Sequence, residues 1–144
     1  MFRGRNVVAV TAMAACTILA LLFVATPAQA SSTCDGSSCY GLDPSFTYSS
    51  IDGALCSTGA YTPTGAVLSA SPGYLELRYG PHCHANWAKI TSSSPGTFFY
   101  VASSNGNQSQ GFTVPSGSTS GYTNMITGYP TARACDSAGC TGWF

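Results

Sequence analysis

Six cysteines follow a stretch that has the features of a secretory signal peptide, and this combination limits the folds open to the chain. Arg3 and Arg5 provide a positive start, residues 7–24 are apolar, and Ala28-Gln29-Ala30 is a small-residue cleavage site. Thiols oxidise outside the cytoplasm, so disulfides form and persist there. We therefore expect a secreted, extracellular protein with disulfide bonds. The cysteines expected in these bonds are Cys34, Cys39, Cys56, Cys83, Cys135 and Cys140.

Two other interpretations of the N-terminal stretch stay open. Residues 7–24 approach the roughly 17 residues that span a bilayer, so the stretch could remain as an uncut anchor. Cys16 follows two alanines, which leaves open a lipid-modified cysteine, although cleavage there would divide the apolar region. We favour a signal peptide at residues 1–30 and a single small domain at residues 31–144.

The charges of the mature part exclude several classes of partner. It has three cations against five carboxylates, a formal net charge of −2, and neither sign forms a cluster. These residues are Arg78, Lys89, Arg133, Asp35, Asp43, Asp52, Glu76 and Asp136. Nucleic acids and anionic lipid surfaces both require a basic surface. We therefore expect no nucleic acid partner and no membrane contact after signal cleavage.

A period of two residues predicts a β-hairpin near the middle of the chain. Residues 66–70 are short and apolar, residues 71–73 are a Ser-Pro-Gly turn signal, and residues 74–79 alternate. The two faces of the alternating segment carry Leu75, Leu77 and Tyr79 on one side and Tyr74, Glu76 and Arg78 on the other. We expect the leucines to enter a core and the Glu76–Arg78 pair to lie in water, where it contributes about 0–1 kcal/mol.

Further short strand candidates are separated by turn signals, and residues 31–50 are expected to form a loop fastened by disulfides. The candidates are residues 85–90, with Trp87 turned inward, and residues 97–101, 111–114, 122–127 and 131–135. After residue 30, apolar residues do not recur at helical spacing for more than one turn. The sequence therefore predicts a mainly β fold: a small antiparallel β-sandwich or barrel, disulfide-reinforced, with little helix after the signal peptide.

Two short cysteine loops repeat one pattern. Residues 34–39 and residues 135–140 both read Cys-Asp, then three small residues, then Cys. An aspartate that begins a tight turn suits any short disulfide loop. We favour this explanation over a duplicated binding loop.

The sequence contains no coherent set of catalytic or metal-binding residues. His82 and His84 share one face of an extended segment, but Cys83 between them points the other way and is expected in a disulfide. No serine or cysteine stands beside a base in a known catalytic arrangement. We therefore predict no catalytic residue, no metal and no cofactor. A hydrolase would have Asp43, Asp52 or Glu76 as its acid, by elimination alone.

Aromatic residues give a better indication of function than charged ones. Tyr74, Tyr100 and Tyr122 are the tyrosines expected to face outward. Tyrosine joins apolar area to a hydrogen-bonding tip, so these side chains could stack on sugar rings or form a protein-binding patch. Packing in the core is the alternative for each of them.

Residues 74–90 resemble the core motif of domain of unknown function 2690, the YjfA-like proteins of actinobacteria and related Gram-positive bacteria. The shared pattern is an acidic-Leu-Arg-Tyr run, a short turn, a cysteine, and Trp-Ala before an apolar residue. Residues 39–44 resemble the Cys, Gly and Asp-Pro signature of that family, and Cys56 resembles its third cysteine. The chain departs from the pattern at Gly80, where serine is common, and in its last two cysteines.

This resemblance covers residues 34–127 and implies export, a closed set of the first four cysteines and no assigned catalytic residue. Cys135 and Cys140 would then be left to bond each other. It also suggests a link between Cys56 and Cys83, which would close a loop of about 27 residues and stabilise the fold by ~3–4 kcal/mol on the chain-entropy model.

Two functions of different class remain. We favour a secreted, non-catalytic β domain that binds a component of the Gram-positive cell surface, either a wall polysaccharide or a surface protein. The alternative is a small wall-acting hydrolase that uses one of the three carboxylates named above. A structural or surface-coat protein is a third possibility.

Overall fold

The computed structural model describes residues 32–70 and 72–144. The signal peptide, the anchor alternative and Cys16 lie outside these residues. The elements are β1 (Ser32–Cys34), the 3₁₀ helix η1 (Gly36–Cys39), β2 (Thr47–Ser49), β3 (Val67–Ala70), β4 (Gly73–Gly80), β5 (Ala85–Thr91), β6 (Phe98–Ser103), β7 (Ser109–Thr113), β8 (Gly121–Tyr122), β9 (Ile126–Thr127), β10 (Ala132–Asp136) and β11 (Gly139–Cys140). No helix within the described residues has the length and apolarity to cross a membrane.

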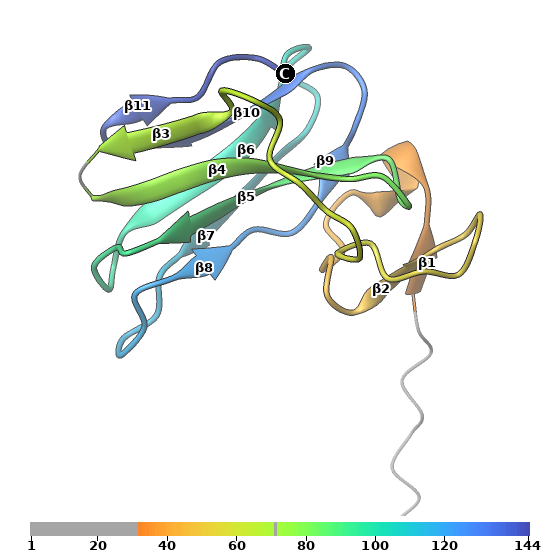
Figure 1. The fold of residues 1–144 in the computed structure, drawn as a ribbon, viewed down its shortest axis with the longest axis horizontal. Helices are drawn as coiled ribbons and strands as arrows, with labels where there is room; N and C mark the ends of the chain where they lie inside the picture. The colour runs from red at the N-terminus through yellow and green to blue at the C-terminus, as the bar shows by residue number, and fades with distance from the viewer. Residues whose placement is uncertain (1–31, 71) are drawn as a thin grey trace, which may run out of the picture.

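Two open sheets pack face to face, and a third, smaller sheet lies at one end of them (Figure 1). One sheet has the order β3-β4-β5-β8, with β9 also paired to β5, and the other has the order β11-β10-β6-β7. The small sheet is a parallel pair of β1 and β2. Across the interface between the two large sheets, β10 contacts β4 and β5, and β6 contacts β5. The sandwich form of the predicted β fold is thus confirmed, and the sheets do not close into a barrel.

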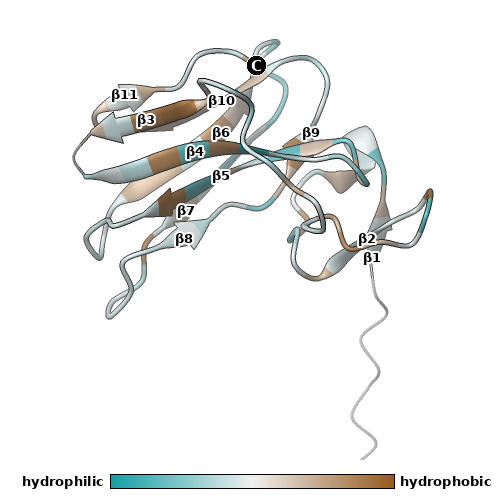
Figure 2. Ribbon diagram, viewed as in Figure 1, coloured by the Kyte–Doolittle hydropathy of each residue, from teal (hydrophilic) through white to brown (hydrophobic). Residues whose placement is uncertain are grey.

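The alternating segment of residues 74–79 forms part of β4, as predicted, and its register explains the core. Leu75 pairs with Ile90 and Leu77 with Ala88, and all four are fully buried. Figure 2 shows the resulting alternation of apolar and polar bands along β4. We call the buried set between the two large sheets the sandwich core. It consists of Ala66, Leu75, Leu77, Ala88, Ile90, Phe99, Val101, Val114, Ile126, Ala132 and Ala134.

A second buried cluster joins the small sheet to the end of the sandwich. We call it the cystine core; it consists of Cys34, Cys39, Cys56, Cys83, Ala85, Trp87 and Met125. The disulfides are Cys34–Cys39, Cys56–Cys83 and Cys135–Cys140, which agrees with the closed set that the resemblance implied. Trp87 points inward from β5, as predicted, and only 4% of its surface is exposed.

The Glu76–Arg78 pair does not lie in water, contrary to the prediction. Thr62 Oγ1 donates a hydrogen bond to Glu76 Oε1 at 2.9 Å, and Arg78 Nη2 donates one to the carbonyl of Ala60 at 2.6 Å. Only 24% of the Arg78 side chain and 16% of the Glu76 side chain are exposed to solvent. The segment before β3 crosses this face and pairs Tyr61 with β4, a path that strand periodicity cannot predict.

Two other local predictions also need correction. Residues 31–50 were expected to form only a loop, but this segment contains β1, η1 and β2. Residues 131–135 were expected at an edge, but β10 has β6 on one side and β11 on the other. The two similar cysteine loops also differ in structure, because residues 36–39 form a 3₁₀ turn whereas Cys135 and Cys140 are paired across a β-hairpin. The shared pattern is therefore not a structural duplication.

Candidate functional site

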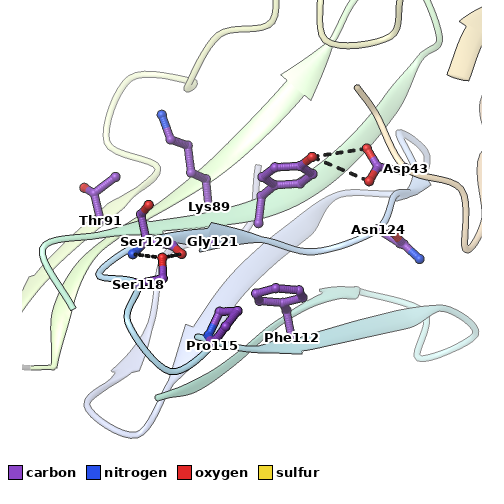
Figure 3. Close-up of a pocket in the computed structure, with 10 residues that line it drawn as sticks. Asp43, Lys89, Thr91, Phe112, Pro115, Ser118, Ser120, Gly121 and Asn124 are labelled. Carbon is purple, nitrogen blue, oxygen red and sulfur yellow. Dashed lines mark hydrogen bonds between the residues drawn. The ribbon is translucent and has the colours of Figure 1, made fainter. Parts of the chain in front are cut away.

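A cleft of about 530 Å³ opens beside β8, at an edge of the sandwich. Figure 3 shows Lys89 and Thr91 on one side of the β8 segment and Phe112 and Pro115 on the other. The lining residues are Asp43, Lys89, Thr91, Phe112, Pro115, Ser118, Ser120, Gly121, Tyr122 and Asn124. The cleft thus combines aromatic rings, hydroxyls, an amide, a carboxylate and an ammonium group.

Tyr122 and Asp43 form the polar centre of the cleft. The Tyr122 hydroxyl donates to both carboxylate oxygens of Asp43, at 3.4 and 3.5 Å (Figure 3). The backbone N–H of Ser45 donates to Asp43 Oδ1 at 2.8 Å and orients the carboxylate further. A phenol and a carboxylate held side by side offer hydrogen-bond acceptors next to an aromatic ring.

Backbone hydrogen bonds bring the segment of Asp43 against the end of β8. Gly41 N–H donates to the Met125 carbonyl at 3.0 Å, and Met125 N–H donates to the Leu42 carbonyl at 2.9 Å. The Asn124 side chain donates to the Gly41 carbonyl at 2.9 Å. The adjoining cystine core contains Met125 and packs Leu42 against it, so the disulfides support the wall that carries Asp43.

Lys89 supplies the only cation among the lining residues of the cleft. In the sheet register it stands between Glu76 on β4 and Tyr122 on β8. The Glu76 carboxylate is engaged by Thr62 and Arg78, and within the described residues Lys89 makes no ion pair. Its ammonium group is therefore available to a ligand.

The apolar wall of the cleft depends on a glycine. A Cβ atom at Gly121 would lie 2.7 Å from the ring of Phe112, closer than real contacts allow. The absence of a side chain therefore lets the Phe112 ring come against β8. Phe112 in turn packs edge to face on buried Phe99, with ring centroids 5.9 Å apart. The sandwich core thus holds this side of the cleft in place.

A second hollow, of about 260 Å³, continues from the cleft along the outer face of β5. It shares Lys89 and Tyr122 with the cleft. Its other lining residues are Pro44, Ser45, Ser57, Ala60, Arg78 and Trp87. The two hollows thus adjoin at Lys89 and Tyr122.

A comparison with known protein families identifies the family of the chain. Residues 37–139 match the model of a family described as protein of unknown function (DUF2690). The chain belongs to this family. No curated protein and no solved structure matches it. The match confirms the resemblance to domain of unknown function 2690; it begins at residue 37 rather than residue 34 and extends to residue 139 rather than residue 127, which includes Cys135.

The three tyrosines expected to face outward lie at different places on the DUF2690 domain. Tyr122 lines the cleft, whereas Tyr100 is on β6 of the opposite sheet and lines another hollow. Tyr74, which is 39% exposed, lies at the β3–β4 turn beside a third hollow. The structure therefore groups none of them with another; their role in binding stays a prediction.

The three candidate acids of a hydrolase also do not form one group, because each carboxylate is hydrogen-bonded to a different residue. Asp43 is bonded to Tyr122, Glu76 to Thr62, and Asp52 to His82. The hydrogen bond with His82, followed by that from the Ala54 N–H, lowers the pKa of Asp52 from 3.8 to about 2. A general acid needs a raised pKa, so Asp52 is shifted in the wrong direction for this role.

Both histidines of the DUF2690 domain pair with aspartates that sequence reasoning did not connect to them. His82 Nδ1 lies 2.6 Å from Asp52 Oδ2, and His84 Nδ1 lies 2.6 Å from Asp35 Oδ1. The pairs flank Cys83 and connect the β4–β5 turn to the segments that follow β1 and β2. They join residues 30 and 49 positions apart, so no local sequence signal indicates them.

The four sulfurs of the cystine core lie within 4.8 Å of one another, a spacing that four metal ligands can have. All four are bonded in disulfides and are buried. Zinc binds cysteine as the thiolate, and a disulfide sulfur is not such a ligand. This cluster therefore acts as a covalent crosslink of the fold.

Proposed function

We propose that this DUF2690 domain is a secreted, non-catalytic module that binds a saccharide of the cell surface in the cleft beside β8. The observation that carries the proposal is the pairing of Tyr122 with Asp43 in a concave groove that also holds Asn124 and Lys89. An aromatic ring can stack on the apolar face of a sugar, while carboxylate, amide and hydroxyl groups bond its hydroxyls.

The shape and charge of the site favour a saccharide over a protein partner. Protein-binding sites bury broad patches, whereas this site is a concave cleft in which aromatic rings stand beside hydroxyl, amide and carboxylate groups. It has one carboxylate and one unpaired ammonium group, so it offers no basic surface for a polyphosphate. The small domain with three disulfides is compatible with an extracellular location, where wall polysaccharides are found.

The test is binding of the disulfide-intact secreted protein to isolated Gram-positive cell walls and to soluble oligosaccharides released from them. We expect co-sedimentation with the walls and saturable binding of the oligosaccharides. The substitution Tyr122→Ala should weaken oligosaccharide binding by about fivefold or more, because a stacked ring contributes about 1–3 kcal/mol in the related case of nucleobases. Asp43→Asn should also weaken it.

Tyr61→Ala is the matched control, because Tyr61 is 51% exposed and lines neither the cleft nor its continuation. It should bind like the wild type. Failure of the walls and of every released oligosaccharide to bind would overturn the proposal. So would equal binding by the Tyr122→Ala and Tyr61→Ala proteins.

A further inference from the structure

An aromatic pair lies on the outer face of β6, in the sheet opposite the cleft. Along this strand Phe99 and Val101 point into the sandwich core, so Phe98 and Tyr100 point outward. The two outward rings have centroids 6.1 Å apart and planes within 26° of each other. Phe98 is 56% exposed, so the two rings present an aromatic surface rather than a single exposed side chain. We call this pair the β6 platform.

The neighbouring strand β7 leaves room for the platform. Gly111 stands directly opposite Tyr100, and a Cβ atom at Gly111 would lie 2.7 Å from two atoms of the Phe98 ring. The Phe98 ring therefore occupies the space above Gly111, next to the Tyr100 ring. An aromatic side chain that covers a strand glycine is a known way to stabilise a sheet, but it does not require a second parallel ring beside it.

A hollow of about 410 Å³ borders the platform. Besides the two rings, it is lined by Pro72, Gly96, Thr97, Asp136 and Ser137. Hydroxyl and carboxylate groups thus lie next to the aromatic surface. These groups can bond the hydroxyls at the rim of a sugar ring whose face rests on an aromatic ring.

The charge pattern limits what can bind here. No aspartate, glutamate, lysine, arginine or histidine occurs between Lys89 and Arg133, a stretch that includes all of β6 and β7. Asp136 is the one charged residue that borders the hollow. A polyanion would find no cation among the lining residues, so the chemistry suits an uncharged ligand.

We propose that the β6 platform is a second binding site, for a neutral polysaccharide whose sugar rings stack on Phe98 and Tyr100. It shares no lining residue with the cleft or its continuation and lies on the other sheet (Figure 1). The site therefore goes beyond the cleft proposed above and does not depend on it. Two sites on one small domain would raise its retention on a surface that carries both ligands, through multivalency.

The test is retention of the disulfide-intact secreted protein on insoluble chitin and on regenerated cellulose, both neutral polysaccharides. We expect retention on at least one of them. Phe98→Leu should reduce it at least tenfold, because leucine still covers Gly111 but offers no ring face. Tyr100→Ala should reduce it similarly, and circular dichroism should show that both variants stay folded.

Two comparisons separate this site from the cleft. Tyr122→Ala should lose binding of soluble wall oligosaccharides while its retention on the neutral polymer persists. Phe98→Leu should show the opposite. The proposal is overturned if neither polymer retains the wild-type protein, or if Phe98→Leu is retained equally well. Phe98-dependent dimerisation in sedimentation experiments, without retention on polymer, would instead assign the surface to a second copy of the chain.

Discussion

The sandwich core and the cystine core reach full burial by different means. The sandwich core is formed largely by strands of five to eight residues, in which alternate side chains from two sheets meet. The cystine core is formed largely by a 3₁₀ turn, strands of three residues and loops. Short irregular segments bury little apolar surface of their own, so two disulfides replace part of the packing that long strands provide.

The two cores meet along β5, and the candidate cleft lies where they meet. Trp87 belongs to the cystine core, and Ala88 and Ile90 belong to the sandwich core. Of the cleft residues, Asp43 comes from the disulfide-held part, whereas Phe112 packs against the sandwich core. One wall of the candidate cleft is therefore stabilised by side-chain packing, and the other is stabilised by disulfide bonds.

The largest expected effect comes from a cavity in the sandwich core. Phe99 is fully buried and packs on Phe112, so Phe99→Ala should lower the free energy of unfolding by about 3–5 kcal/mol. Urea unfolding with all disulfides intact measures this loss. The control is Phe46→Ala, at a side chain that is 74% exposed, which should change stability by less than about 0.5 kcal/mol. Equal effects would show that the sandwich core is not the main source of stability.

Removing one disulfide of the cystine core should lower the free energy of unfolding by a nearly equal amount. The loss should be confined to a different part of the molecule. The double substitution Cys56→Ala and Cys83→Ala opens a link across 27 residues and should cost about 3.5 kcal/mol on the chain-entropy model. Hydrogen exchange should show protection lost in residues 32–62 while β4, β5 and β6 keep theirs. The link between Cys135 and Cys140 spans five residues, so its removal should cost only about 2 kcal/mol. A uniform loss of protection would contradict the division into two cores.

A smaller effect is expected at Gly80 of β4, which lies against Cys56 and Trp87 of the cystine core. A Cβ atom there would lie 2.6 Å from the Cys56 carbonyl oxygen and 2.9 Å from the Trp87 ring. Gly80→Ser should therefore cost about 1–3 kcal/mol by overpacking, although serine is common at this place in the resembled pattern. Gly142→Ser is the control, since its nearest neighbour is the side chain of the terminal Phe144. Thermal unfolding that is unchanged in Gly80→Ser would contradict this close packing of Gly80 against the cystine core.

The smallest effect concerns an exposed pair at the rim of the cystine core. The bond with His82 lowers the pKa of Asp52 to about 2 in the folded protein, below its ordinary value of 3.8. The contribution of this pair is therefore present above pH 3.8 and is lost as the pH falls toward 2. NMR titration of the Asp52 carboxyl should show this low pKa, and His82→Gln should return it toward 3.8. A normal pKa in the wild type would contradict the contact.

Sequence periodicity predicted the sandwich more fully than the cystine core. The alternation of β4 indicated correctly that Leu75 and Leu77 are buried, because two-residue periodicity is a local property of a strand. It gave the wrong environment for Glu76 and Arg78, because a loop from elsewhere in the chain covers them. The segment of residues 31–50 has no such period, so its short strands were missed.

The candidate cleft was only partly predictable. Tyr122 and Asp43 each stood out in the sequence, one as an outward aromatic and one as a possible acid. They are 79 positions apart, and no pattern in the sequence indicated that they touch. Phe98 was missed, although its place two residues before Tyr100 in a strand indicates a shared face.

By itself the amino-acid sequence determined the family, the mainly β class and the six cysteines that form the crosslinks, because these depend on residue types and on short-range alternation. Only the tertiary structure decided that Asp43 meets Tyr122, that both histidines meet aspartates and that Phe98 lies above Gly111. Such contacts join residues on different strands or distant loops, and their geometry depends on sheet order, register and loop paths rather than on local propensity.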